Sequence, residues 1–161
     1  MKRIIFITTL LIMSIFSLTS KGQTLPPLNQ KIVDYVKTVI GKKVDRGECW
    51  DLANRALTDN KAEWDGEYKY GTLLNPKKDE ILPGDIIQFE KVKVVFKVGN
   101  TTTTEMMPHH TAIVYRVIEA GTYELAHQNT GFSGRKVGLS EFNLNNMVKG
   151  KIYFYRPEYK K

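Results

Sequence analysis

Hydrophobic residues recur at helical spacing in two segments of the N-terminal half of the chain. In the first, residues 28–40, apolar side chains fall every three or four positions, and Gly41 follows as a stop signal. The second begins at Cys49 and keeps the same spacing through residue 57, so Cys49 is expected in its first turn. Asp45, in the turn before it, is a candidate cap. The pattern predicts two amphipathic helices.

The second half of the chain shows the alternating and β-branched patterns that are typical of strands. The segment before it, residues 60–75, is polar and has no clear period. Expected strands cover residues 86–89, 91–98, 110–118, 123–128 and 152–155, with a hairpin loop at 99–100 that leads into a further strand and a glycine-containing loop at 131–138. Helices followed by hairpin-linked strands predict one α+β domain, with N-terminal helices packed on an antiparallel β-sheet.

The first residues have the features of an export signal. Lys2 and Arg3 precede an apolar run over residues 4–16, which suits a signal sequence and is short for a membrane span. Residues 20–22, serine, lysine and glycine, then offer the small-x-small pattern of a cleavage site. We therefore expect a signal peptide over 1–22 and an exported protein, periplasmic or extracellular. An uncleaved N-terminal anchor is the competing interpretation.

Composition and charge narrow the class of partner. The 161-residue chain has material for one core, and its formal charge of +7 falls to +4 if the signal peptide is removed. Such a mildly basic surface suits an anionic polymer and is weak evidence for nucleic acid. We expect a monomer with no nucleic-acid partner and no stable membrane span after signal cleavage.

The chain has a single cysteine, Cys49, which excludes a disulfide scaffold and a cysteine-rich zinc module. In an oxidising compartment an unpaired thiol is a buried inert residue, half of an intermolecular disulfide, or a nucleophile. A helix start favours the third interpretation, because the N-terminal N–H groups and the helix dipole stabilise a thiolate. The backbone N–H of Cys49 could also stabilise an oxyanion.

A nucleophilic thiol needs a base, and the chain has three histidines. His109 and His110 open an expected strand, so their side chains point to opposite faces and one of them can meet Cys49. His110 shares its face with small or apolar residues, as a sheet face packed on a helix would need. His109 shares its face with Thr111, Ile113 and Tyr115, so the alternation alone does not choose between the two histidines. In the next strand His127 and, if the strand continues, Asn129 share a face that could orient the imidazole of His110.

Four short segments resemble the motifs of CHAP domains, a branch of the NlpC/P60 superfamily of papain-like peptidoglycan hydrolases. Residues 47–55 (Gly-Glu-Cys-Trp-Asp-Leu-Ala-Asn-Arg) resemble the nucleophile motif, and residues 82–89 (Leu-Pro-Gly-Asp-Ile-Ile-Gln-Phe) resemble a Pro-Gly-Asp strand entry. Residues 110–114 (His-Thr-Ala-Ile-Val) are similar to the catalytic-histidine strand, which selects His110 over His109. Residues 127–129 (His-Gln-Asn) stand where CHAP domains usually have Glu-x-Asn, so a histidine replaces the glutamate.

The resemblance implies a papain-like fold, with a lead-in and helix over 23–41 and a CHAP-like cysteine hydrolase domain over 42–161. It implies that Cys49 is the nucleophile and His110 the base. His127 is then the third catalytic member, with Asn129 as its helper or substitute. The implied substrate is an amide in the peptide part of peptidoglycan, cut as an amidase or an endopeptidase, with no cofactor and no metal.

Three alternatives remain open on the sequence. The first is a zinc site built from His109, His110 and His127 with a carboxylate such as Glu105 or Glu124. Adjacent histidines on a strand point to opposite faces and cannot easily share one ion, which argues against this site. The second is a catalytically inactive envelope-binding module of the same fold. The third is the same chemistry directed at proteins, small amides or rival cells.

Overall fold

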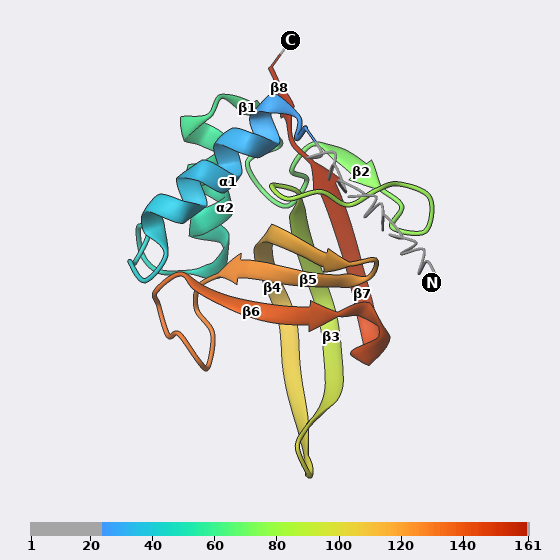
Figure 1. The fold of residues 1–161 in the computed structure, drawn as a ribbon. Helices are drawn as coiled ribbons and strands as arrows, with labels where there is room; N and C mark the ends of the chain where they lie inside the picture. Colours follow the sequence, from blue (N-terminus) through green and yellow to red (C-terminus); the bar gives the residue numbers. More distant parts are fainter. Residues whose placement is uncertain (1–23, 161) are drawn as a thin grey trace, which may run out of the picture.

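The computed structural model describes residues 24–160, so the expected signal peptide lies outside the described residues. The elements, in chain order, are α1 (Pro27–Val39), α2 (Cys49–Asp59), β1 (Ala62–Glu63), β2 (Thr72–Leu74), β3 (Ile86–Val98), β4 (Thr101–Glu119), β5 (Thr122–His127), β6 (Gly138–Asn143), the 3-10 turn η1 (Leu144–Asn146), β7 (Met147–Arg156) and β8 (Glu158–Tyr159). The predicted α+β class and both predicted helices are confirmed (Figure 1). No helix formed by residues 24–160 is long and apolar enough to cross a bilayer.

The main sheet has six antiparallel strands in the order β2-β7-β3-β4-β5-β6, and β1 pairs with β8 in a separate two-stranded sheet. The large sheet is strongly curved. Phe89 on β3 and Phe142 on β6 have ring centroids 5.1 Å apart, although two strands separate them in the sheet order. Tyr123 on β5 and Phe154 on β7 approach to 5.4 Å in the same way. Side chains of one sheet face therefore meet across the curve and form a core of their own.

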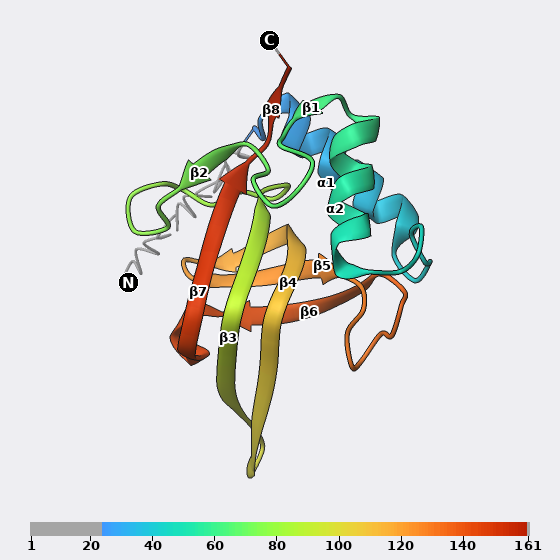
Figure 2. The same ribbon diagram turned by 180° about the vertical axis from the view of Figure 1, so that it is seen from behind.

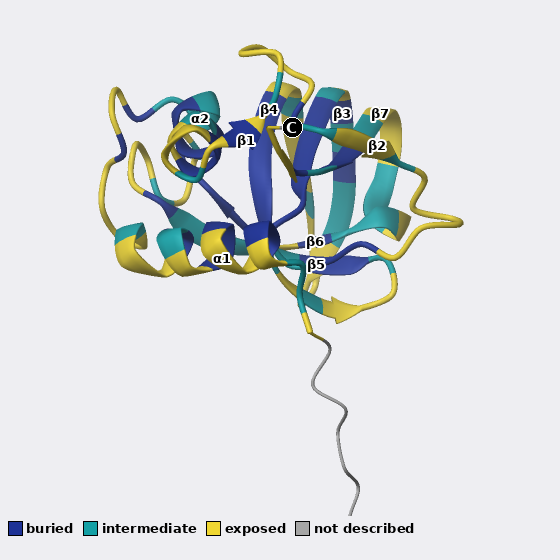
Figure 3. Ribbon diagram, turned by 90° about the horizontal axis from the view of Figure 1, so that it is seen from above, coloured by how far each residue is buried: buried dark blue, intermediate teal, exposed yellow. Residues whose placement is uncertain are grey.

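The helices cover the other face of the sheet. Apolar positions of both helices share one buried cluster with strand residues, which include Leu28, Ile32, Val36, Leu52, Leu57, Ile86, Ile113 and Ala126. Figures 1 and 2 show α1 and α2 lying side by side at one end of the molecule, and Figure 3 shows that the outer face of α1 is exposed. Helix α1 is thus part of the same core as α2 and the sheet.

Several strand boundaries differ from the prediction. The expected strands 86–89 and 91–98 are one strand, β3, in which the pairing with β7 slips between Glu90 and Lys93 and Lys91 adopts φ +53°. The expected strand 110–118 begins nine residues earlier, because the threonine run from Thr101 pairs with the far end of β3. Strands β1 and β2 fall in the segment that has no readable period, and β6 contributes only two large apolar side chains, Leu139 and Phe142.

Candidate active site

Cys49 is the first residue of α2, as the sequence predicts, and Glu48 takes the N-cap position. The expectation that Asp45 caps this helix is wrong, because its carboxylate pairs with Arg55 at 3.4 Å. The loop is instead ordered by Asp51, whose Oδ2 accepts the backbone N–H groups of Arg46 at 3.0 Å and Glu48 at 3.1 Å. A carboxylate in the first turn therefore fixes the approach to Cys49.

Gln128 connects this loop to the end of β5. Its side chain is fully buried and donates from Nε2 to the carbonyl oxygens of Val44 at 3.0 Å and Glu48 at 2.8 Å. Its Oε1 accepts the N–H of Val44 at 3.2 Å. Because Gln128 follows His127 directly, these bonds hold the residue before Cys49 in register with the histidine strand. The sequence places Gln128 within the 127–129 motif, but the pattern predicts no role for it.

The thiol of Cys49 is half-buried beside β4. Burial raises its pKa above the ordinary value, and the nearby backbone of Thr111 and Trp50 opposes that rise. The balance keeps the thiol protonated near neutral pH. The helix start alone does not produce a standing thiolate.

His110 and His127 form a buried hydrogen-bonded pair. His110 Nε2 lies 2.9 Å from His127 Nδ1, and His127 Nε2 lies 2.8 Å from Ser140 Oγ on β6. Burial is the main cause that lowers the pKa of His110 to about 4, and the charge of His109 adds to it. Burial also lowers the pKa of His127 to about 3, followed by the charge of His110. Both rings are therefore neutral at pH 7.

The chain of bonds couples the tautomers of the two rings, and its direction decides which nitrogen of His110 is free. A neutral imidazole carries a single N–H. If His110 donates from Nε2 to His127, then His127 carries its proton on Nε2 and donates to Ser140. Nδ1 of His110 is then left as an unprotonated acceptor. Ser140 had no signal in the sequence, because β6 itself was not predicted.

His110 reaches the site by a different route from the one expected. Helix α2 packs on the sheet face that carries Ile113, whereas His110 lies on the concave face, with its ring centroid 6.0 Å from that of Phe89. The prediction that the His110 face packs on the helix is therefore wrong. Cys49 and His110 line the same cavity, beside the part of β4 that lies beyond the end of β5.

Asn129 does not continue the face of β5. The strand ends at His127, and Asn129 turns away with φ +62°. Its Nδ2 donates to Glu48 Oε2 at 2.7 Å, and among the described residues the side chain bonded to His110 is that of His127. Asn129 thus supports the helix cap at the rim of the site, while His127 occupies the position that orients His110.

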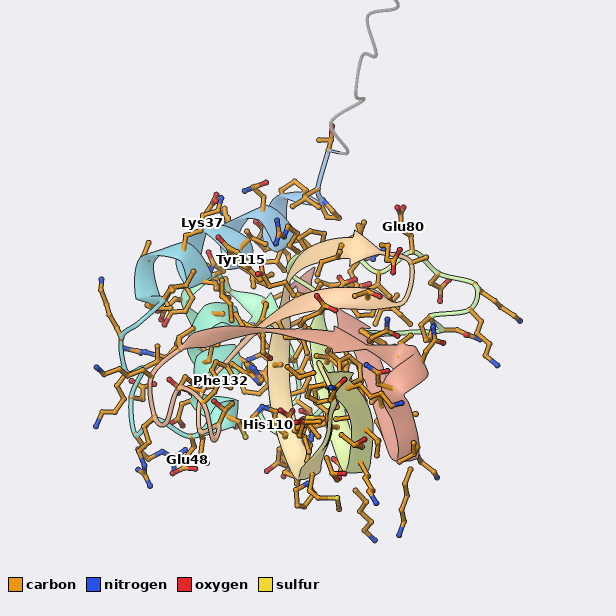
Figure 4. The ribbon with its side chains drawn as sticks, turned by 60° about the horizontal axis from the view of Figure 1, so that its bottom comes forward. Lys37, Glu48, Glu80, His110, Tyr115 and Phe132 are labelled. Carbon is orange, nitrogen blue, oxygen red and sulfur yellow. The ribbon has the colours of Figure 1, made fainter. Side chains whose placement is uncertain are left out.

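One cavity of about 550 Å³ brings these residues together. Its lining is Cys49, Glu105, Met106, Met107, Pro108, His109, His110, His127, Asn129, Thr130, Gly131 and Phe132. Figure 4 shows Glu48, Phe132 and His110 gathered at the end of the molecule where α2 begins. All four residues selected from the sequence, Cys49, His110, His127 and Asn129, therefore line the same cavity.

The zinc alternative finds no support in this geometry. His109 lies on the opposite side of β4 from His110, with Nδ1 3.0 Å from Glu90 Oε2. Glu124 pairs with Arg116 at 3.3 Å. Within residues 24–160, no three histidine, cysteine or acidic side chains are grouped closely enough to hold a metal ion.

The buried histidine pair gives a prediction for stability against pH. Because both pKa values are lower in the folded chain than the ordinary 6.5, the unfolded chain binds more protons below that pH. The free energy of unfolding should be fully supported above pH 6.5 and should fall by about 3 kcal/mol for each ring as pH drops toward 4. Chemical denaturation at fixed pH values measures this slope.

The matched control is the double variant His110→Asn, His127→Asn, which removes both titrating rings but leaves other acidic groups in place. Its unfolding free energy should show a shallower decline between pH 6.5 and 4 than that of the native chain. Equal slopes for the two proteins would contradict the buried neutral pair.

The fold and the site define a cysteine-proteinase-type domain: a cysteine opens a helix that packs on an antiparallel sheet, and a histidine from that sheet lies in the same cavity. Residues 27–161 match the family described as the AIM3/BBC1 cysteine proteinase-fold domain, and the chain belongs to this family. The papain-like class predicted from the sequence is confirmed at this level.

Individual relatives are more distant. The chain is 27% identical over 144 residues to the altered inheritance of mitochondria protein 3 of Debaryomyces hansenii. The matched region covers 78% of this chain and 15% of that protein. The chain therefore spans less than a sixth of that relative. Two structures of Ly7917, one with the hydrolyzing product of MDP, match 79% and 80% of the chain and 62% and 63% of theirs, at 17% and 18% identity and TM-scores of 0.45 and 0.46.

Proposed function

We propose that this protein is an exported cysteine hydrolase that cleaves an amide bond in the peptide part of peptidoglycan. The observation that carries the proposal is that Cys49, at a helix start, lines the same cavity as His110, whose ring is hydrogen-bonded through His127 to Ser140. The motif resemblance to CHAP and NlpC/P60 domains supports the substrate class. The apolar segment over residues 4–16 supports export.

The chemistry is acyl transfer from a neutral resting pair. Cys49 attacks the amide carbonyl carbon while its thiol proton passes to Nδ1 of His110. The carbon–nitrogen bond then breaks, and His110 gives that proton to the leaving amine. Water attacks the resulting thioester through the same base, which releases a carboxylic acid and returns the proton to the sulfur. This differs from a standing thiolate–imidazolium pair, because burial disfavours both charges.

His127 and Ser140 support this cycle through their bonds to the His110 ring. His127 accepts the Nε2–H of His110 and holds the ring so that Nδ1 stays available. A neutral histidine stabilises an imidazolium less than a carboxylate does, which is consistent with the low pKa of His110. We therefore assign the third role to His127, and Asn129 bonds to the cap residue Glu48.

A second candidate is a catalytically inactive binding module of the same fold. The observation that favours it is the raised pKa of the Cys49 thiol, which leaves no preformed nucleophile. Such a module would bind its ligand equally well after Cys49→Ala and would turn nothing over.

Product analysis tests the proposal. The mature protein is incubated with purified muropeptides and, separately, with free stem peptides, and new amines and carboxylates are located by mass spectrometry. Cleavage at the sugar–peptide junction indicates an amidase, and cleavage within the stem indicates an endopeptidase. Cleavage of neither substrate by the native chain, with intact binding by Cys49→Ala, would favour the binding module.

A further inference from the structure

Four lysines lie on one face of the sheet, beyond the reach of the helices. Val92 and Val94 are buried in the core of the concave face, so Lys93 between them points to the opposite face. Residues directly opposite each other in antiparallel strands share a face, which extends this set to β4 and β7. The lysine face consists of Lys93, Val95 and Lys97 on β3, Lys149 and Lys151 on β7, and Thr102, Thr104 and Met106 on β4.

The lysine face is open to solvent. Lys97, Lys149 and Lys151 are exposed, and Lys93 is partly exposed. Tyr153, two residues after Lys151, still packs against the core under the helices. Figure 2 shows β3, β4 and β7 in front of β5 and β6, and the lower parts of these three strands extend past both helices. The face therefore continues the helix-covered surface of the sheet beyond the point where the helices stop.

Nearby carboxylates do not balance the positive charge of the lysine face. Within residues 24–160, none of its four lysines forms an ion pair with a carboxylate. Glu90, directly opposite Lys151, already contacts the ring of His109 at 3.0 Å. Glu105 is paired with Val94 and so lies on the concave face. The face thus carries a surplus of positive charge.

Two of the four lysines stand directly opposite each other. Lys93 and Lys149 are partners in the pairing of β3 with β7. Opposed side chains in an antiparallel pair have Cβ atoms about 5 Å apart, and like charges at such positions destabilise the sheet. An anion bound between the two ammonium groups removes this repulsion. The arrangement therefore favours a bound anion over a bare surface.

The spacing of the lysines fits a chain of phosphates. Lys93 and Lys97 are four residues apart, about 13 Å along β3, and neighbouring strands are about 4.8 Å apart. The charges therefore recur over a path longer than one small anion spans. Thr102 and Thr104 beside them offer hydroxyl donors, which suit phosphate oxygens. The apolar side chains of the face are Met106 and the partly exposed Val95, which give little surface to insert into lipid.

We propose that the lysine face binds a linear polymer of phosphate groups, which lies across β3 and β7. The ammonium groups hold successive phosphates as point charges, and the threonine hydroxyls of β4 donate to phosphate oxygens. Met106 also lines the cavity of Cys49, so the bound polymer holds the protein with this cavity next to the surface that carries the polymer. The proposal goes beyond the proposed function, because binding at this face uses neither Cys49 nor His110.

Fluorescence anisotropy of an end-labelled linear polyphosphate tests the proposal with the mature protein at several salt concentrations. If all four lysines contact phosphate, the dissociation constant should rise about 50-fold between about 50 and 200 mM salt, because each contact releases condensed counterions. The double variant Lys93→Gln, Lys149→Gln keeps two contacts, so the same salt step should change its dissociation constant only about sevenfold. Lys93→Arg, Lys149→Arg should preserve the native salt dependence.

The matched control is Lys77→Gln, Lys78→Gln, which removes the same charge from two exposed lysines in the turn before β3 and should leave the native salt dependence intact. Thermal unfolding checks that each variant is folded. Equal weakening of both glutamine variants would overturn the proposal, because net charge alone would then explain binding. Equal affinity for polyglutamate, or tighter binding to vesicles of phosphatidylglycerol and phosphatidylcholine in equal parts, would overturn it as well. Polyphosphate binding at this face by a native chain that cleaves no muropeptide would support it and refute the proposed function instead.

Discussion

Replacing Cys49 by alanine is expected to lower kcat/KM by at least about 1,000-fold with little change in stability. The thiol is the one group in the cavity that can form a thioester, so the variant retains binding but loses the covalent path. The side chain is half-buried, so the fold tolerates the loss of sulfur. Steady-state hydrolysis of a cleaved muropeptide measures the effect.

His110→Ala should cause a loss of similar size, because thiol and base act as one unit. The double variant should then be no worse than either single variant, whereas independent contributions would multiply. His127→Ala should cost less, since it acts through His110. Circular dichroism and thermal unfolding provide the control for folding. Undiminished turnover by Cys49→Ala would refute the mechanism.

The second large effect is expected on stability, at the Pro-Gly-Asp turn. Asp85 is fully buried and accepts bonds from Asn29 on α1 at 2.8 Å and from the N–H of Leu82 at 2.8 Å. Arg156 on β7 donates to both of its oxygens, at 3.1 and 2.8 Å. Asp85 thus ties a helix, a turn and a strand together, and Asp85→Ala should cost about 3–5 kcal/mol of unfolding free energy.

Denaturant titration of the native chain, Asp85→Ala and the double variant Asp85→Leu, Arg156→Met measures this. Most of the cost comes from leaving the half-buried guanidinium and the Asn29 amide without their acceptor, so removing Arg156 as well should recover part of it. A loss below about 1 kcal/mol for Asp85→Ala would show that water replaces the carboxylate.

The sequence predicted the parts of the site that depend on local pattern. Helical spacing placed Cys49 at the start of α2, and the alternation separated His109, which bonds to Glu90, from His110, which bonds to His127, although both line the cavity. These predictions succeed because period and capping are properties of neighbouring residues. The papain-like class followed from short motifs in the right order.

The parts that failed depend on where strands end, on which strands pair and on burial. Where β5 ends decides that His127 meets His110 and that Asn129 turns to Glu48, and no pattern at residues 127–129 marks that end. Ser140 enters the site because β6 pairs with β5, which places it on the same face as His127, and β6 is too weakly apolar to be predicted. The thiol and imidazole pKa values follow from burial, which a local pattern does not contain.

The assignment of Cys49 and His110 as a nucleophile–base pair is tested most directly by the rate of Cys49 alkylation with iodoacetamide as a function of pH. The measurement compares the native chain with His110→Gln and needs no substrate. In the native chain the alkylation rate should rise with pH around the His110 pKa of about 4, because only the neutral ring can accept the thiol proton during attack. In the variant the alkylation rate should rise only where the thiol itself ionises, at a pH above its ordinary pKa. At pH 6 the native rate should then exceed the variant rate by at least about 100-fold. Superimposable profiles for the two proteins would contradict the pair and leave the binding module as the account of this site.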